Sequence, residues 1–146
     1  MASYQNYATV VYENLREMYH AGALTYGEKT LFREKQNGEF VSYSYRRYCE
    51  DVDALGTALL AQKNLVGKRI LLMGENSYAW ALSFMAVICG VGVVVPVDKD
   101  ISPEGLKILA DTCEAAAVIH APELAAVAAA AGEGNTCIGF DQLPPP

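Results

Sequence analysis

The chain alternates between segments whose apolar residues have helical spacing and segments whose apolar residues are continuous. The clearest helical segment starts at Tyr45, where apolar side chains recur every three or four residues as far as Leu59. Ser44, directly before it, fits a helix N-cap because its side-chain oxygen accepts a hydrogen bond from an otherwise unpaired backbone N–H. The pattern therefore predicts a helix of about eighteen residues, ending near Lys63 and Asn64.

Similar patterns predict the remaining elements. A helix is expected from Asn6 to about Tyr19, with residues 20–22 ending it. Asn37-Gly38 separates two short strands and predicts a hairpin, since both residues tolerate the positive φ of a type I′ turn. The predicted strands cover residues 30–34, 39–42, 69–73, 93–97, 117–120 and 136–139. The other predicted helices cover residues 78–89, 103–113 and 122–131.

The order of these elements predicts the fold class. After the hairpin, strands and helices alternate, which is typical of a parallel sheet built by right-handed crossovers. Residues 71–73 and 93–95 are entirely apolar, as central strands buried on both faces are. We therefore expect an α/β fold of three layers, with a mostly parallel sheet flanked by helices and an N-terminal β-hairpin.

One long uncharged run, from Ser77 to Val97, has the length of a membrane-spanning helix. Gly90 and Gly92 interrupt it, and the following valines and Pro96 are typical of a strand rather than a helix. A buried helix followed by a buried strand explains the whole run. We therefore expect no transmembrane segment.

Composition and charge restrict the function classes. Hydrophobic residues make up 52% and charged residues 19%, which indicates a globular chain. The net charge is −6 and the basic residues are scattered, which argues against nucleic-acid binding. The four cysteines (Cys49, Cys89, Cys113 and Cys137) form no CxxC pair, and no zinc-type ligand spacing appears. Reduced cysteines and no recognisable signal peptide predict a cytoplasmic location.

The loops after the predicted parallel strands are where such sheets bind ligands. Residues 74–77 (Gly-Glu-Asn-Ser) could cradle an anion, but Asn76 or Ser77 more simply caps the next helix. The acids in Asp98-Lys99-Asp100 could hold a divalent ion, but Lys99 neutralises them locally, so a charged loop is the preferred interpretation. His120 ends a strand, where a general base could lie, yet no obvious partner follows it.

Known phosphate-binding motifs give no better candidate. No GxGxxG or GxxxxGK[ST] sequence occurs, and the G-x-G formed by Gly90 and Gly92 leads into a strand rather than a helix. We therefore assign no catalytic, cofactor-binding or metal-binding residue from the sequence.

Several segments together carry a resemblance to a known family. In order, these are residues 28–33, the turn 37–38, residues 41–45, 53–60, 67–73, 75–77 with Trp80, 92–99 and 102–104. In this order and at these intervals they resemble the AMP-forming adenylating enzymes, and most of all the long-chain acyl-CoA synthetases. The resemblance spans about Asn14 to His120.

The resemblance implies that this chain is an N-terminal part of such an enzyme. In that family the Ser/Thr/Gly-rich phosphate loop and the catalytic lysine lie downstream, and no residue here matches them. The parent is expected to join a fatty acid to coenzyme A through an acyl-adenylate, using ATP and Mg²⁺. Residues 1–146 would form an inactive scaffold subdomain without cofactor, with a helix and lead-in over 1–26 and a linker-like tail over 141–146.

The same resemblance implies the partners. The remainder of the synthetase is the expected one, with a homodimer through uncovered apolar surface as a further possibility and peripheral membrane association of the parent left open. An alternative function is a stand-alone interaction or binding domain of the same ancestry. A flavodoxin-like nucleotide or flavin binder is a third possibility.

Overall fold

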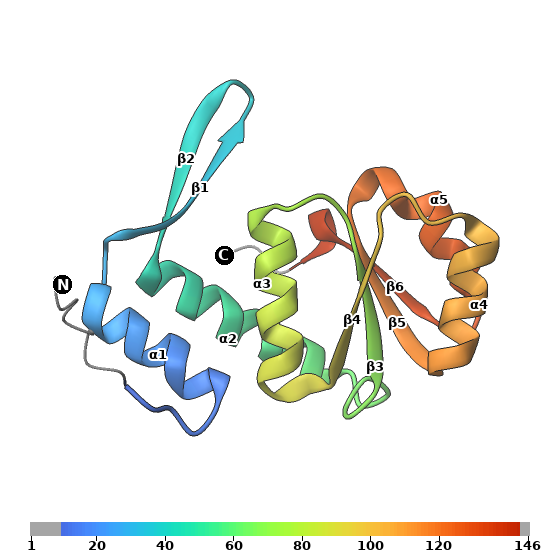
Figure 1. Ribbon diagram of the computed structural model, residues 1–146, viewed down its shortest axis with the longest axis horizontal. Coiled ribbons are helices and arrows are strands. Elements are labelled where there is room, and N and C mark those ends of the chain that lie inside the picture. Colours follow the sequence, from blue (N-terminus) through green and yellow to red (C-terminus); the bar gives the residue numbers. More distant parts are fainter. Residues whose placement is uncertain (1–9, 144–146) are drawn as a thin grey trace, which may run out of the picture.

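The computed structural model describes residues 10–143 as a three-layer α/β structure with a projecting hairpin (Figure 1). The hairpin consists of β1 (Thr30–Gln36) and β2 (Glu39–Ser44), which are antiparallel. The main sheet contains β3 (Arg69–Met73), β4 (Val93–Val97), β5 (Ala115–His120) and β6 (Thr136–Gly139), in the order β4-β3-β5-β6. The longer helices are α1 (Leu15–Tyr26), α2 (Tyr45–Ala61), α3 (Tyr78–Ala86) and α4 (Pro103–Cys113). The predicted fold class is thus confirmed.

All pairings in the main sheet are parallel, and two separate cores form on its two faces. Successive side chains of a strand point to opposite faces. In β3, Ile70 and Leu72 pack with α1, α2 and α3, whereas Leu71 and Met73 pack with α4 and the alanine-rich segment after β5. This double burial explains why the strand reads as one continuous apolar run.

The first helix differs from its prediction. Residues 10–14 are not helical, and α1 begins at Leu15 because the Asn14 side chain accepts a hydrogen bond from Glu17 N. The helix then continues past His20 and Gly22 to Tyr26, where Gly27 ends it with a φ of 50°. Residues 6–9 of the predicted helix lie outside the described residues. A local cap, rather than the apolar spacing, determines where this helix starts.

The predicted Asn37-Gly38 turn and the predicted Ser44 cap are confirmed, and Ser102 caps α4 in the same way. Asn37 and Gly38 have φ values of 50° and 90°, as a type I′ turn requires. Ser44 Oγ accepts from Arg47 N at 3.1 Å, and Ser102 Oγ accepts from Gly105 N at 3.0 Å. These signals act between residues close in the chain, so they depend little on the tertiary packing.

The uncharged run folds as expected into a helix and a strand. Between α3 and β4 the chain makes a π-helical turn, Val87–Val91, in which Gly90 has a φ of 149°. No helix within residues 10–143 is long and apolar enough to cross a membrane.

The alanine-rich segment is helical over the predicted residues 122–131, but it is not one regular α-helix. It forms three short pieces: a 3₁₀ turn at Pro122–Leu124, α5 (Ala125–Ala128) and a second 3₁₀ turn at Ala129–Ala131. Ala128 and Ala131 are buried against the α4 face of the sheet. Gly132, with a φ of 102°, ends this helical segment.

Candidate functional site

The carboxyl edge of the sheet contains a topological switch point between β3 and β5. The chain leaves β3 toward β4 on one side and leaves β5 toward β6 on the other. Here the ring of Phe140 lies against Gly74: a Cβ on Gly74 would lie 2.9 Å from Phe140 Cε2 and 3.1 Å from Ala121 Cβ. Ala121 N also donates to Met73 O at 2.9 Å across the two strands. Phe140 thus occupies part of the place where such sheets commonly bind ligands.

The turn after β3 is a helix start rather than an anion cradle. Ser77 Oγ accepts a hydrogen bond from Trp80 N at 3.1 Å, which caps α3. The preferred interpretation of residues 74–77 agrees with this geometry.

Lys99 connects the acidic loop after β4, residues 98–100, to the carboxyl edge of the sheet. Lys99 Nζ lies 3.0 Å from Glu75 Oε1 and 3.3 Å from Asp100 Oδ1. Hydrogen bonds to Glu75 and Asp100 raise the pKa of Lys99. Asp98 Oδ1 accepts from Asp100 N at 2.9 Å and so shapes the loop itself. These contacts fit a charged loop, as the sequence indicated.

His120 is buried at the end of β5. Its Nδ1 lies 2.8 Å from the carbonyl oxygen of Ala121, so this nitrogen donates to the backbone. Because Nδ1 donates this hydrogen bond, it has a structural partner and is not available as a general base.

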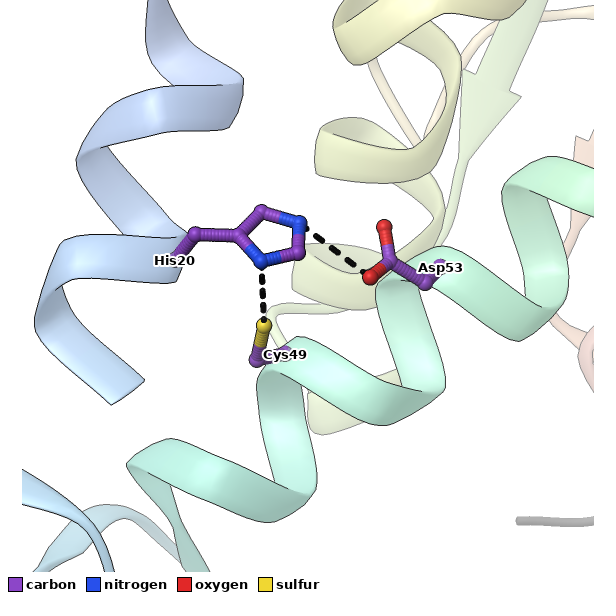
Figure 2. Close-up of side chains that lie close together, drawn as sticks. All are labelled: His20, Cys49 and Asp53. Atoms are coloured by element: carbon purple, nitrogen blue, oxygen red, sulfur yellow. Dashed lines mark hydrogen bonds and ion pairs between the residues drawn. The ribbon is translucent and has the colours of Figure 1, made fainter. Parts of the chain in front are cut away.

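The structure brings together one cluster that the sequence analysis missed: His20, Cys49 and Asp53 (Figure 2). His20 lies on α1, and Cys49 and Asp53 lie one turn apart on α2, where the two helices pack. The Cys49 sulfur lies 3.6 Å from His20 Nδ1, and Asp53 Oδ2 lies 3.1 Å from His20 Nε2. Nitrogen, sulfur and carboxylate oxygen therefore converge within 4.8 Å of one another.

Neighbouring side chains hold the carboxylate of this cluster. The Tyr19 hydroxyl donates to Asp53 Oδ1 at 2.6 Å, and Arg16 Nη2 lies 3.6 Å from the same oxygen. Oδ2 is left facing His20. The Nε2 atom of His20 is buried and, despite its approach to Oδ2, makes no well-directed hydrogen bond within residues 10–143.

The cluster does not have the electrostatics of a nucleophilic triad. Burial raises the pKa of the Cys49 thiol, and the charges of Asp53 and Glu50 raise it further. A reactive cysteine requires the opposite, because the thiolate is the nucleophile. What the arrangement offers chemically is a mixed set of donor atoms rather than an activated sulfur.

A weak sequence signal for this cluster existed. Cys49 and Asp53 are spaced i,i+4 in a strongly predicted helix, which places both on one face. The third member was hidden because His20 was predicted to lie after the end of the first helix. With α1 running to Tyr26, His20 lies in its middle and faces α2.

The three-layer α/β arrangement matches the fold of N-terminal domains of adenylate-forming enzymes. The chain belongs to the AMP-binding enzyme family, whose profile matches residues 19–146. No curated protein sequence matches the chain.

Solved structures share the fold at low sequence identity. The N-terminal domain of FACL13 from Mycobacterium tuberculosis is 19% identical, with a TM-score of 0.78, over 90% of this chain and 35% of that one. The fatty acyl-adenylate ligase from L. pneumophila, solved with acyl adenylate and pyrophosphate, is 14% identical, with a TM-score of 0.74, over 88% and 23%. The Klebsiella oxytoca NpsA N-terminal subdomain, in complex with 3-hydroxybenzoyl-AMSN, is 16% identical, with a TM-score of 0.70, over 87% and 30%. The chain thus spans between 23% and 35% of these structures.

Proposed function

We propose that this chain is the N-terminal scaffold part of an AMP-forming ligase that joins a fatty acid to coenzyme A. The single observation that carries the proposal is the family match over residues 19–146. The resemblance of residues 92–99 and of the hairpin to long-chain acyl-CoA synthetases supports the fatty-acid class. The L. pneumophila structure supports it further, because that ligase is described with an acyl adenylate.

The proposed reaction has two balanced steps. The fatty-acid carboxylate attacks the α-phosphorus of ATP, which forms the acyl-adenylate and releases pyrophosphate. The coenzyme A thiol then attacks the acyl carbonyl, loses its proton and releases AMP. Mg²⁺ would neutralise the phosphates of ATP during the first step.

In this proposal the chain contributes support rather than chemistry. Phe140 occupies part of the switch point beside Gly74, and Lys99 is paired with Glu75 and Asp100. The sheet would serve as a rigid wall on which the remainder of the synthetase packs. Residues 1–146 would form this subdomain, with residues 1–26 as the helix and lead-in and residues 141–146 as the connection onward.

The test uses the longest protein whose reading frame includes residues 1–146. We expect fatty-acid-dependent release of pyrophosphate from ATP, and acyl-CoA only when coenzyme A is added. Hydroxylamine trapping separates adenylation from thioester formation. Pyrophosphate release with an aryl acid or an amino acid instead would overturn the fatty-acid assignment, and no acid-dependent release would overturn the ligase proposal.

One observation favours the alternative of a stand-alone interaction domain. A groove of about 380 Å³ lies among α1, the hairpin and α2, and its lining is mostly aromatic and apolar. Its residues include Met18, Tyr26, Phe32 and Tyr45. A stop codon directly after Pro146 would support this alternative, whereas a downstream glycine-rich phosphate loop would support the synthetase.

A further inference from the structure

An apolar groove of about 380 Å³ lies where α1, the base of the hairpin, α2 and α3 meet. We call it the α1–hairpin groove, and it is lined chiefly by Met18, Tyr26, Phe32, Tyr45, Tyr48 and Met85. Two ring pairs contribute to its wall: Phe32 with Tyr48, whose centroids are 5.1 Å apart, and Tyr26 with Tyr45, at 4.7 Å. These ring contacts hold the groove open in the folded chain, and no side chain of residues 10–143 fills it.

The lining suits apolar side chains better than a charged ligand. Among the described residues, no charged side chain lines the groove. The hydroxyls of Tyr19 and Tyr48 are already used, since they donate to Asp53 and to the carbonyl oxygen of Ala81. Small-molecule sites normally place a few polar groups where they orient the ligand. An apolar groove beside helices instead fits the apolar face of a polypeptide segment.

Helix α1 has a second apolar face that the described part of the chain leaves open. Tyr19 and Ala23 pack into the core on one side of this helix. Leu15, Met18 and Tyr26 follow one another at helical spacing on another face and are 41% to 45% exposed. A surface helix normally has one apolar stripe and a polar outer face. The second apolar stripe therefore indicates a further contact along the groove.

The hairpin beside the groove is also incompletely supported. Among residues 10–143, β1 and β2 pair only with each other, and their tip projects away from the helices (Figure 1). Phe40, close to the turn, is 68% exposed. A two-stranded hairpin is marginally stable in water unless it gains further strands or packs against a helix. The hairpin and the groove therefore both lack a covering surface.

The position of Leu143 indicates which segment covers them. Leu143 packs against the same apolar core that contains Tyr19 and Tyr48 of the groove. A longer chain would thus continue from the side of the sheet on which the groove lies. The chain spans between 23% and 35% of the structures that share its fold, so most of each of those proteins has no counterpart here.

We propose that the polypeptide after Pro146 in the parent synthetase docks apolar side chains into the α1–hairpin groove and covers the projecting hairpin. The proposal rests on the proposed function, in which residues 1–146 are one part of a larger ligase. Docking buries the exposed face of α1 and fixes α1 and the hairpin relative to the sheet. A second copy of the chain would use the same groove in the stand-alone alternative, so the experiment separates the two occupants.

The experiment measures the rate at which a cysteine in the groove is alkylated. It compares the longest protein whose reading frame includes residues 1–146 with the chain alone. Met18→Cys places the thiol in the groove, and Leu24→Cys is the matched control, because Leu24 is 87% exposed on the same helix and does not line the groove. Peptide mass spectrometry separates each new thiol from the native cysteines, and far-UV circular dichroism shows whether each variant is folded.

In the longer protein, Met18→Cys should react at least about tenfold more slowly than Leu24→Cys, because the covering segment must open first. In the chain alone both thiols should react readily. Protection of Met18→Cys in the chain alone would overturn the proposal, and sedimentation would then show whether a second copy is the occupant. Equal rates in the longer protein, or a reading frame that ends at Pro146, would also overturn it.

Activity distinguishes failure of this proposal from failure of the proposed function. If the longer protein forms acyl-CoA while Met18→Cys reacts as fast as Leu24→Cys, the ligase assignment stands and the groove proposal is wrong. Protection of Met18→Cys without acid-dependent release of pyrophosphate would support the docking and overturn the ligase assignment.

Discussion

The hydroxyl of Tyr78 donates a 2.6 Å hydrogen bond to Oδ2 of Asp51, a buried carboxylate on the neighbouring helix. Arg47 Nε reaches both oxygens of Asp51, at 2.8 and 2.9 Å. The ring of Tyr78 stacks on Tyr43 of the hairpin, with centroids 3.6 Å apart and planes 7° from parallel. Tyr78 thereby joins α3, α2 and the hairpin through one side chain.

Removing this hydroxyl is expected to destabilise the fold. Tyr78→Phe keeps the ring stacking but deprives buried Asp51 of one donor, so the free energy of unfolding should fall by about 1–3 kcal/mol. Tyr43→Phe is the control, because the Tyr43 hydroxyl accepts from the exposed Gln36 side chain and its loss should cost far less. Urea unfolding of the two variants checks the difference, and equal losses would contradict the assigned role of Asp51.

Stability should fall at alkaline pH. Burial raises the pKa of Tyr19, Tyr48 and Tyr78 above the ordinary value of 10.0, so the folded state keeps protons that the unfolded state loses. Their contribution is fully present below pH 10 and declines as the pH rises above it. The buried Cys49 thiol and the half-buried Cys89 thiol act in the same direction from about pH 9.

The measurement is urea unfolding at a series of pH values from neutral to strongly alkaline. The free energy of unfolding should decline above about pH 9 to 10. The decline should be shallower in Tyr78→Phe, which has one titrating phenol fewer. A flat profile over this range would contradict the prediction.

Gly92 should tolerate no side chain. A Cβ at this position would overlap the carbonyl oxygen of Lys68, which also accepts from Val93 N at 2.9 Å where β3 and β4 begin to pair. Gly92→Ala should therefore reduce the free energy of unfolding by about 1–3 kcal/mol. Gly134→Ala is the matched control, since a Cβ there meets nothing within 4 Å and the φ angle is not in the left-handed region. Thermal unfolding of both variants gives the comparison.

The chain alone should bind no ATP in the micromolar range. Phe140 occupies part of the switch point beside Gly74, and Ser77 is engaged as the cap of α3. Calorimetry with Mg·ATP should therefore show no saturable heat at micromolar concentrations. A one-to-one micromolar isotherm would contradict both this prediction and the scaffold role.

Local interactions made much of the fold predictable. Asn37-Gly38 specifies its turn through backbone preferences, and Ser44 and Ser102 cap their helices through neighbours three residues away. The apolar runs at 69–73 and 93–97 predicted buried strands because both faces of a central strand need hydrophobic side chains. An error arose where apolar spacing extended beyond a cap, as before Asn14.

The sequence by itself determined the hairpin and the alternation of strands and helices, because these depend on residues near one another in the chain. The alternation in turn implied a parallel sheet, since consecutive strands joined through a helix run in the same direction. The tertiary structure decided the strand order, the place of Phe140 against Gly74 and the meeting of His20 with Cys49 and Asp53. Each of these relationships joins residues from separate elements. Their distance depends on how whole helices and strands dock, which no local pattern encodes.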